Sequence, residues 1–156
     1  MHEAIARALD DLPEWAHAPE VAFSSYGERG VIDILAFHAR SQSLLVIELK
    51  TEVANVEDLL AVMSRRTRLA KTIASGLEWD ASTVSAWVVI AESNASRRRV
   101  ARFRATLRSA SPSDGRAIRA WLRRPGRPIS ALSFWANDVR SSATQRVSPK
   151  RRVRRA

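Results

Sequence analysis

The chain has 156 residues, of which 46% are hydrophobic, and a formal net charge of +10 at pH 7. This length and apolar content predict one domain with a real hydrophobic core. The chain has no cysteine, which excludes disulfides and thiolate zinc sites, and no apolar run long enough to span a membrane. Acidic residues at Glu3, Asp10 and Asp11 interrupt any signal-peptide pattern, so we expect a cytoplasmic protein, with association with the nucleoid left open.

The predicted elements follow one another as helix, three strands, helix, strand, two helices and a last strand. Their ranges are a helix at 2–12, strands at 20–26, 31–38 and 43–51, a helix that Asn55 caps and that runs to about Ser75, a strand at 84–91, helices at 95–107 and 116–123, and a strand at 129–135. Residues 13–19 are expected to form a loop. This order predicts an α/β domain whose mixed sheet carries helices on both faces. The domain should cover residues 1–137, followed by a disordered basic tail at 138–156.

Two neighbouring predicted strands carry charged residues within otherwise apolar runs. The break between them is too short for a helix, which predicts an antiparallel hairpin. If its turn is centred on Arg40 and Ser41, Asp33 lies opposite Glu48, and Lys50 shares the face of Glu48. Opposed carboxylates repel each other and need a counter-charge, which Lys50 supplies in part and a divalent metal would complete. This layout is typical of a metal-dependent phosphodiesterase site.

The combination of Asp33 with Glu48-Leu49-Lys50 resembles the PD-(D/E)xK nuclease superfamily. The lead-in at 27–33 and the Glu-Leu-Lys-Thr ending resemble one branch, in which a nuclease-like domain follows a helix-turn-helix in actinobacterial regulators. The resemblance implies a restriction-endonuclease-like core of αβββαβ order, Mg²⁺ or Mn²⁺ as cofactor and DNA as substrate. Two features depart from the pattern: Ile32 replaces the Pro of the name, and the chain starts almost at the nuclease-like helix.

The resemblance also implies roles for single residues. Asp33, Glu48 and the backbone carbonyl of Leu49 would be metal ligands, and Lys50 would orient or activate the attacking water. A carboxylate from the first helix often joins such a site, and Glu3 matches it by position. An acidic residue in the first turn of a helix also favours the helix dipole without any other role. Glu20, at the start of the first predicted strand, is the alternative carboxylate.

Positive charge is confined to the C-terminal part of the chain. Residues 1–92 carry a net charge of −6, residues 93–137 carry +10 and residues 138–156 carry +6. Such a distribution suits a polyanion such as nucleic acid, although 23 of the 26 basic residues are Arg, which a GC-rich coding sequence would also produce. The candidate nucleic-acid-binding residues, some of which a solvated helix face would explain equally well, are Arg65, Arg68, Lys71, Arg97, Arg98 and Arg102.

Three functions compete at this stage. The first is a Mg²⁺-dependent DNA endonuclease. The second is a non-catalytic module with the nuclease fold that binds DNA or acts in regulation. The third is a subunit of a larger complex that uses its arginine-rich tail as an anchor. A membrane partner is not expected, and homodimer formation stays open.

Overall fold

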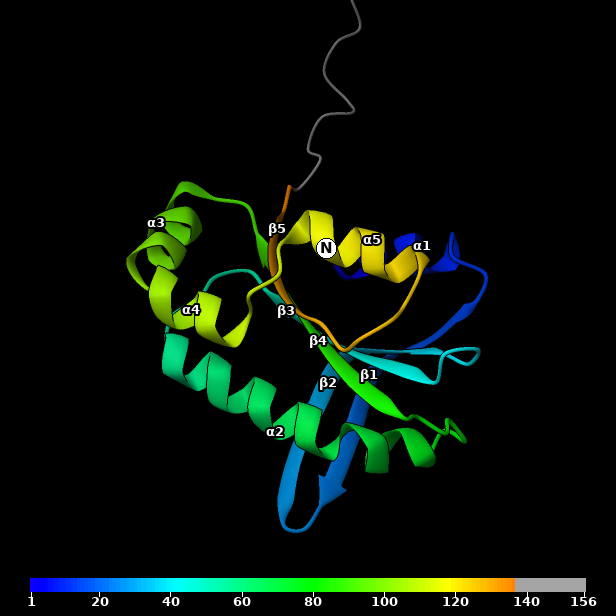
Figure 1. Cartoon of the computed structure of the whole chain (residues 1–156). Helices are drawn as coiled ribbons and strands as arrows, with labels where there is room; N and C mark the ends of the chain where they lie inside the picture. Colours follow the sequence, from blue (N-terminus) through cyan, green and yellow to red (C-terminus); the bar gives the residue numbers. More distant parts are fainter. Residues whose placement is uncertain (137–156) are drawn as a thin grey trace, which may run out of the picture.

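The structure is a computed structural model that describes residues 1–136. Its strands are β1 (Trp15–Ser25), β2 (Glu28–His38), β3 (Ser43–Lys50), β4 (Thr83–Ala91) and β5 (Ser130–Trp135). Its helices are α1 (His2–Asp10), α2 (Val56–Ser75), α3 (Asn94–Arg102), α4 (Arg104–Ala110) and α5 (Gly115–Arg123). Figure 1 shows how these elements are arranged.

The five strands form one mixed sheet in the order β1-β2-β3-β4-β5. The pairs β1–β2 and β2–β3 are antiparallel, whereas β3–β4 and β4–β5 are parallel. Parallel neighbours need long crossover connections, and helices supply both of them. Helix α2 connects β3 to β4, and α3, α4 and α5 lie between β4 and β5. The expected α/β class with a mixed sheet is therefore confirmed.

The hairpin of β2 and β3 has the register expected from the sequence. Its paired residues include Ile34 with Ile47 and Phe37 with Leu44, so the numbers of each pair add up to 81. This register centres the turn between Arg40 and Ser41. A slip by one residue would move each side chain to the opposite face, so Ile34 and Ile47 would leave the cluster that they share on one side of the sheet.

Two layers of helices cover the two faces of the sheet, as expected (Figure 1). On one face, Leu44 and Val46 pack in a cluster with residues of α2 and with Leu107 of α4. On the other face, Leu45 and Ile47 pack in a cluster with residues of α1 and α5. Strand β3 is buried from Ser43 to Glu48, as is typical of a central strand covered on both sides.

The first strand begins earlier than predicted. The expected loop at 13–19 is wrong from Trp15 onwards, because β1 starts there and pairs with β2 from Trp15 opposite His38. Since β1 is an edge strand, Pro19 can stand within it without removing a hydrogen bond from the interior of the sheet. The Trp15 indole donates to the Leu122 carbonyl at 2.8 Å, which ties the start of β1 to the end of α5.

The predicted helix at 95–107 is also wrong in one respect, since it is two helices. Helices α3 and α4 meet at Phe103, whose φ of −105° and ψ of 25° are not helical. The bend lets Phe103 and Leu107 both reach the core cluster beneath α2. Helix α2, by contrast, is capped as predicted: the Asn55 side chain accepts from the Asp58 N–H at 3.1 Å.

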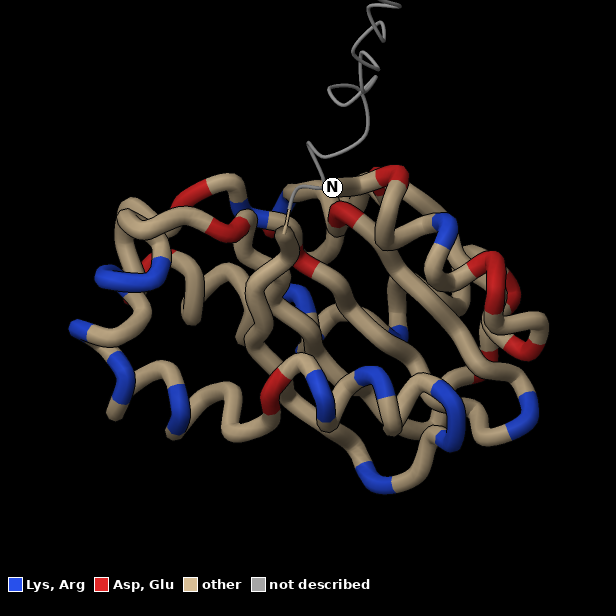
Figure 2. The backbone as a smooth tube through the Cα atoms, turned by 90° about the horizontal axis from the view of Figure 1, so that it is seen from above, with Lys and Arg blue, Asp and Glu red and all other residues tan. Residues whose placement is uncertain are grey.

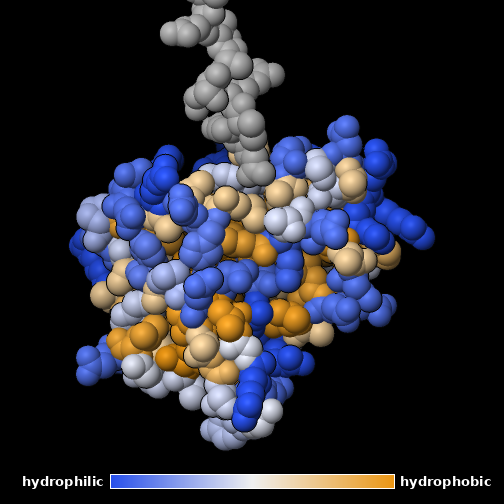
Figure 3. All heavy atoms as spheres, turned by 180° about the vertical axis from the view of Figure 1, so that it is seen from behind, coloured by the Kyte–Doolittle hydropathy of each residue, from blue (hydrophilic) through white to orange (hydrophobic). Residues whose placement is uncertain are grey.

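The surface opposite to the view of Figure 1 has apolar side chains near its middle, with hydrophilic side chains around them (Figure 3). None of the helices within residues 1–136 is both long and apolar enough to cross a membrane. The predicted tail at 138–156 lies outside the described residues.

Strand β2 offers a direct stability test. Ile34 is fully buried in the middle of the sheet, whereas Val31, on the same strand, is 42% exposed. We expect Ile34→Ala to lower the free energy of unfolding by about 2–5 kcal/mol, because it removes buried methyl groups and leaves a cavity. Val31→Ala should cost less than about 1 kcal/mol. Urea denaturation measures both, and equal losses would contradict the burial of β2.

Candidate active site

The candidate residues lie where β2 and β3 separate. Strand β3 pairs with β4 as far as Lys50, but its pairing with β2 stops at Ile34 opposite Ile47. The next residue of β2 towards this end is Asp33, whose Oδ2 accepts a hydrogen bond of 2.7 Å from the Leu49 N–H. The Asp33 side chain thus occupies the place of a backbone partner, and its carboxylate lies beside the peptide that joins Glu48 to Leu49.

The backbone is irregular at Asp33 on β2 and at the facing position on β1. Ile32 and Leu35 pack on the α2 face and Ile34 on the opposite face, so the alternation of β2 is interrupted at Asp33. Across the hairpin, Glu20 of β1 has a left-handed φ of 49°. The Asp33 carbonyl oxygen lies 3.1 Å from His2 Nε2, which donates to it in the Nε2–H tautomer. Helix α1 is therefore linked to the site through His2.

Glu48 is only 2% exposed and has a cation on each carboxylate oxygen. Lys50 Nζ lies 2.9 Å from Oε1, and the Arg66 guanidinium of α2 forms an ion pair with Oε2. Burial lowers the pKa of Arg66 from its ordinary value, and the nearby charge of Asp33 acts in the opposite direction. Arg66 thus interacts with both carboxylates, and the four groups carry two negative and two positive charges.

Arg66 is the residue that the sequence prediction missed. A metal was expected to complete the counter-charge of the two carboxylates, and in the described structure Arg66 supplies a large part of it. A sequence signal for this role exists, because Arg66 falls at helical spacing between buried Met63 and buried Ala70. An arginine in the apolar stripe of a helix needs a buried anion as partner.

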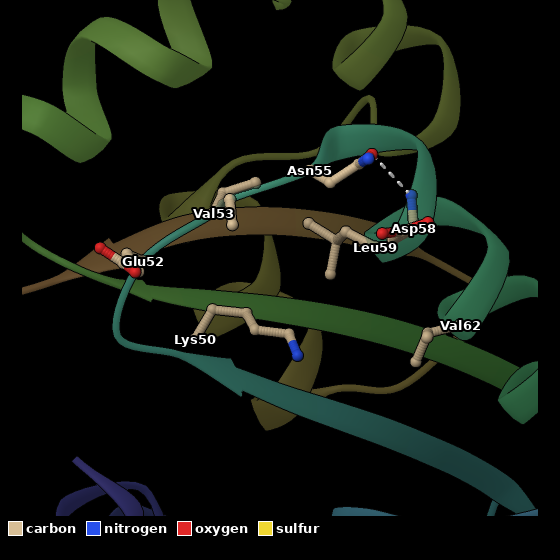
Figure 4. A pocket seen from close by; sticks show the side chains of 8 residues that line it. Lys50, Glu52, Val53, Asn55, Asp58, Leu59 and Val62 are labelled. Carbon is tan, nitrogen blue, oxygen red and sulfur yellow. Dashed lines mark hydrogen bonds between the residues drawn. The ribbon is translucent and has the colours of Figure 1, made fainter.

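A pocket of about 200 Å³ opens beside Lys50. Lys50 and Val53 line it from the end of β3 and the segment that follows, and Asn55, Asp58 and Leu59 line it from the start of α2 (Figure 4). Figure 4 shows the hydrogen bond between Asn55 and Asp58 that fixes this helix start. Lys50 therefore contacts Glu48 with its ammonium group and lines an open pocket with the same side chain.

The other candidate carboxylates are not joined to the site by any contact among residues 1–136. Glu3 points to solvent, with 86% of its side chain exposed, and pairs with Arg7 of the same helix at 3.3 Å. Glu20 is exposed on the edge strand. In this part of the chain, no group of three or more His, Cys, Asp or Glu side chains is placed to hold a metal ion. The carboxylates of the site are therefore Asp33 and Glu48.

The six predicted nucleic-acid-binding residues fall into two groups. Three of them pair with a glutamate, and the other three form no ion pair within residues 1–136. Arg65 and Arg68 of α2 pair with Glu28 at the start of β2, at 3.4 and 3.0 Å, and so connect this helix to the hairpin. Arg97 of α3 holds Glu92 by two hydrogen bonds of 2.6 and 2.9 Å and lies 4.1 Å from the centre of the Phe134 ring. The second group, whose side chains are exposed, consists of Lys71, Arg98 and Arg102. Figure 2 shows where the basic and acidic residues fall along the backbone.

Comparison with known proteins gives no indication of the function of this chain. No family model matches the chain, and no curated protein or solved structure matches it either. The function of this site therefore rests on its own geometry. Where β2 and β3 separate, the site contains two carboxylates, a lysine and an arginine.

The pairing of Arg66 can be tested through stability. We expect Arg66→Met to cost about 3–5 kcal/mol of unfolding free energy, because it removes one partner of a buried ion pair and leaves the other. Arg65→Met, one position away on the same helix, should cost less than about 1 kcal/mol, because its partner Glu28 is more exposed.

A double-mutant cycle by urea denaturation measures this pairing. Combining Arg66→Met with Glu48→Gln should recover part of the loss, since the buried side chain at position 48 then no longer carries a charge that needs Arg66. Strictly additive losses would show that Arg66 and Glu48 do not interact.

Proposed function

We propose that this protein is a metal-dependent phosphodiesterase that acts on DNA, the activity implied by the resemblance to PD-(D/E)xK nucleases. The observation that carries the proposal is the Asp33 carboxylate held at 2.7 Å on the Leu49 N–H, directly after Glu48 in the chain, with Lys50 paired to Glu48. The general α/β class of the domain, with a mixed sheet and the order α1-β1-β2-β3-α2-β4, is compatible with the proposal.

The oxygen donors of the site suit a hard divalent cation in their chemistry. Asp33 and Glu48 offer carboxylates and Leu49 a backbone carbonyl, the ligand types that Mg²⁺ and Mn²⁺ prefer. An ion bound there would polarise the phosphate and neutralise charge that develops during hydrolysis. Because Arg66 pairs with Glu48, its guanidinium has to move away from Oε2 before that oxygen can serve as a ligand.

Lys50 is the residue we assign to the reacting phosphate. Its side chain is 36% exposed, so solvent and substrate can reach it, while its ammonium group is held 2.9 Å from Glu48. From this position it can orient an attacking water and stabilise negative charge on the phosphate oxygens in the transition state. A fixed ammonium needs no rearrangement at that moment, which is what makes such a charge effective.

One observation favours a second function, a non-catalytic module of the same fold that binds DNA. Lys50 and Arg66 already balance the charges of Asp33 and Glu48, so the described site is electrically neutral without an ion. A site that needed a cation for folding would lack this balance. The two functions differ in whether DNA is cut.

Metal binding should be visible in the melting temperature. A ligand that binds only the folded state at a hundredfold excess over its Kd stabilises it by about 2.7 kcal/mol. We expect Mg²⁺ or Mn²⁺ to raise the melting temperature of the wild type by several degrees and that of Asp33→Asn by much less. The asparagine keeps an oxygen for the Leu49 N–H but loses the charge. Equal shifts in both proteins would place the ion elsewhere.

Hydrolysis itself is tested with plasmid, linear, nicked and branched DNA, each with and without Mg²⁺ or Mn²⁺. We expect metal-dependent cleavage by the wild type. Lys50→Ala should lose at least about 100-fold of the rate while keeping most of its DNA affinity, because the lysine acts mainly in the transition state. Arg123→Ala, an exposed basic residue at the end of α5 and outside the site, is the control and should cleave normally. Binding without cleavage of any substrate would decide for the non-catalytic module.

A further inference from the structure

A groove at the β5 edge of the sheet concentrates positive charge. The groove has a volume of about 730 Å³ and lies between the α3–α4 pair and α5. Its charged lining consists of five arginines and a single aspartate, namely Arg97, Arg104, Arg108, Arg116, Arg119 and Asp114. It therefore carries four net positive charges, and none of these residues belongs to the site of Glu48 and Lys50.

Most of these charges are not paired with an acidic side chain among residues 1–136. Arg97 is fixed by Glu92 and Phe134, and Asp114 caps α5 by accepting from the Ala117 N–H at 2.8 Å. The other four arginines form no ion pair within residues 1–136; they are Arg104, Arg108, Arg116 and Arg119. They stand as two pairs, at i,i+4 on α4 and i,i+3 on α5, and like charges at these spacings weaken a helix. Their concentration in one groove therefore indicates an external anion.

The walls of the groove are fixed in place. A Cβ atom at Gly115, at the start of α5, would lie only 3.0 Å from the Ser133 Cβ of β5, so helix and strand are in close contact. Leu107, Leu132 and Phe134 supply apolar parts of the lining. The groove thus has an apolar floor, with arginines of α3 and α4 on one side and arginines of α5 on the other. This combination matches a sugar–phosphate chain, whose phosphates bind guanidinium groups and whose sugars contact apolar atoms.

The sheet register relates the groove to the candidate active site. Glu48 pairs with Val88, which pairs with Leu132, and Lys50 pairs with Ile90, which pairs with Phe134. The groove floor thus shares two cross-strand rows with Glu48 and Lys50. Neighbouring strands lie about 4.8 Å apart, so the two places are separated by roughly 10 Å across β4. A nucleic acid whose phosphate meets Lys50 has only a few nucleotides to cover before it reaches the groove.

We propose that this arginine groove binds the phosphate backbone of a nucleic acid and holds it alongside the site of Glu48 and Lys50. The groove goes beyond the proposed hydrolysis and does not depend on it, because its arginines bind phosphates whether or not a bond is cut. Its ligand is recognised by regularly spaced negative charge rather than by sequence.

The test is the salt dependence of DNA binding by the full chain in EDTA, where no metal-dependent cleavage occurs. Fluorescence anisotropy is measured with labelled duplex and single-stranded DNA of equal length. The comparison shows whether the groove prefers the phosphate backbone of a duplex or that of a single strand. The groove variant is Arg104→Gln with Arg116→Gln, one arginine from each wall. The matched control is Arg29→Gln with Arg123→Gln, two exposed arginines outside the groove.

Compared with the wild type, we expect the slope of log K against log salt to be less steep for the groove variant. The difference should be about 1.8 with duplex DNA and about 1.4 with single-stranded DNA. Affinity at 0.1 M salt should fall roughly 60-fold with duplex, while the control keeps the wild-type slope. Thermal melting should show that both variants are folded. Both variants keep Glu48 and Lys50, and the measurement needs no cleavage, so a failure of the hydrolysis proposal leaves this result intact.

Two outcomes would overturn the groove proposal. Equal losses in the groove variant and the control, including no loss in either, would mean that the position of the arginines does not matter. Competition by polyglutamate as strong as that by DNA of the same number of charges would point to an acidic protein partner instead.

Discussion

The almost complete burial of Glu48 is the constraint on which the rest of the site depends. An unpaired carboxylate in a protein interior costs several kcal/mol, and the negative charge of Asp33 nearby adds repulsion to that cost. An exposed salt bridge returns less than 1 kcal/mol, so a surface cation would not be enough. The structure meets this demand with Lys50 on the same strand and Arg66 from the helix above. The position of α2 over the sheet is thus tied to the charge of one central residue.

Asp33 satisfies a different demand at the same place. Where β2 leaves β3, the Leu49 N–H loses its backbone partner on that side, and a buried donor without an acceptor costs about 1–3 kcal/mol. The Asp33 carboxylate supplies the acceptor, and the separation of the strands opens the sheet beside Glu48. Both acidic residues therefore have a structural reason to be where they are. Their chemistry has to be judged by what their charge does, which is why amide substitutions are more informative here than alanine.

The sequence predicted those parts of the molecule that depend on local pattern. The hairpin register followed from a turn placed at Arg40 and Ser41 between two apolar runs, and the cap of α2 followed from Asn55. The start of β1 was missed because Pro19 indicates a loop unless the strand is known to be an edge. The break at Phe103 and the partner of Arg66 were missed because each depends on what a side chain meets across the core. The nuclease assignment was not tested by the fold, which is mixed α/β in any case.

The two groups of cations in this chain differ in what surrounds them. Lys50 and Arg66 contact buried Glu48, so their charges are largely neutralised within the protein. Arg104 and Arg116 face a groove whose only acid, Asp114, is already engaged as a helix cap. We expect a polyanion to be attracted first to the groove, while the neutral site beside it would take up a metal ion only when Arg66 leaves Glu48. Affinity and chemistry would then be divided between two places that the sheet holds two strands apart, so either can be lost without the other.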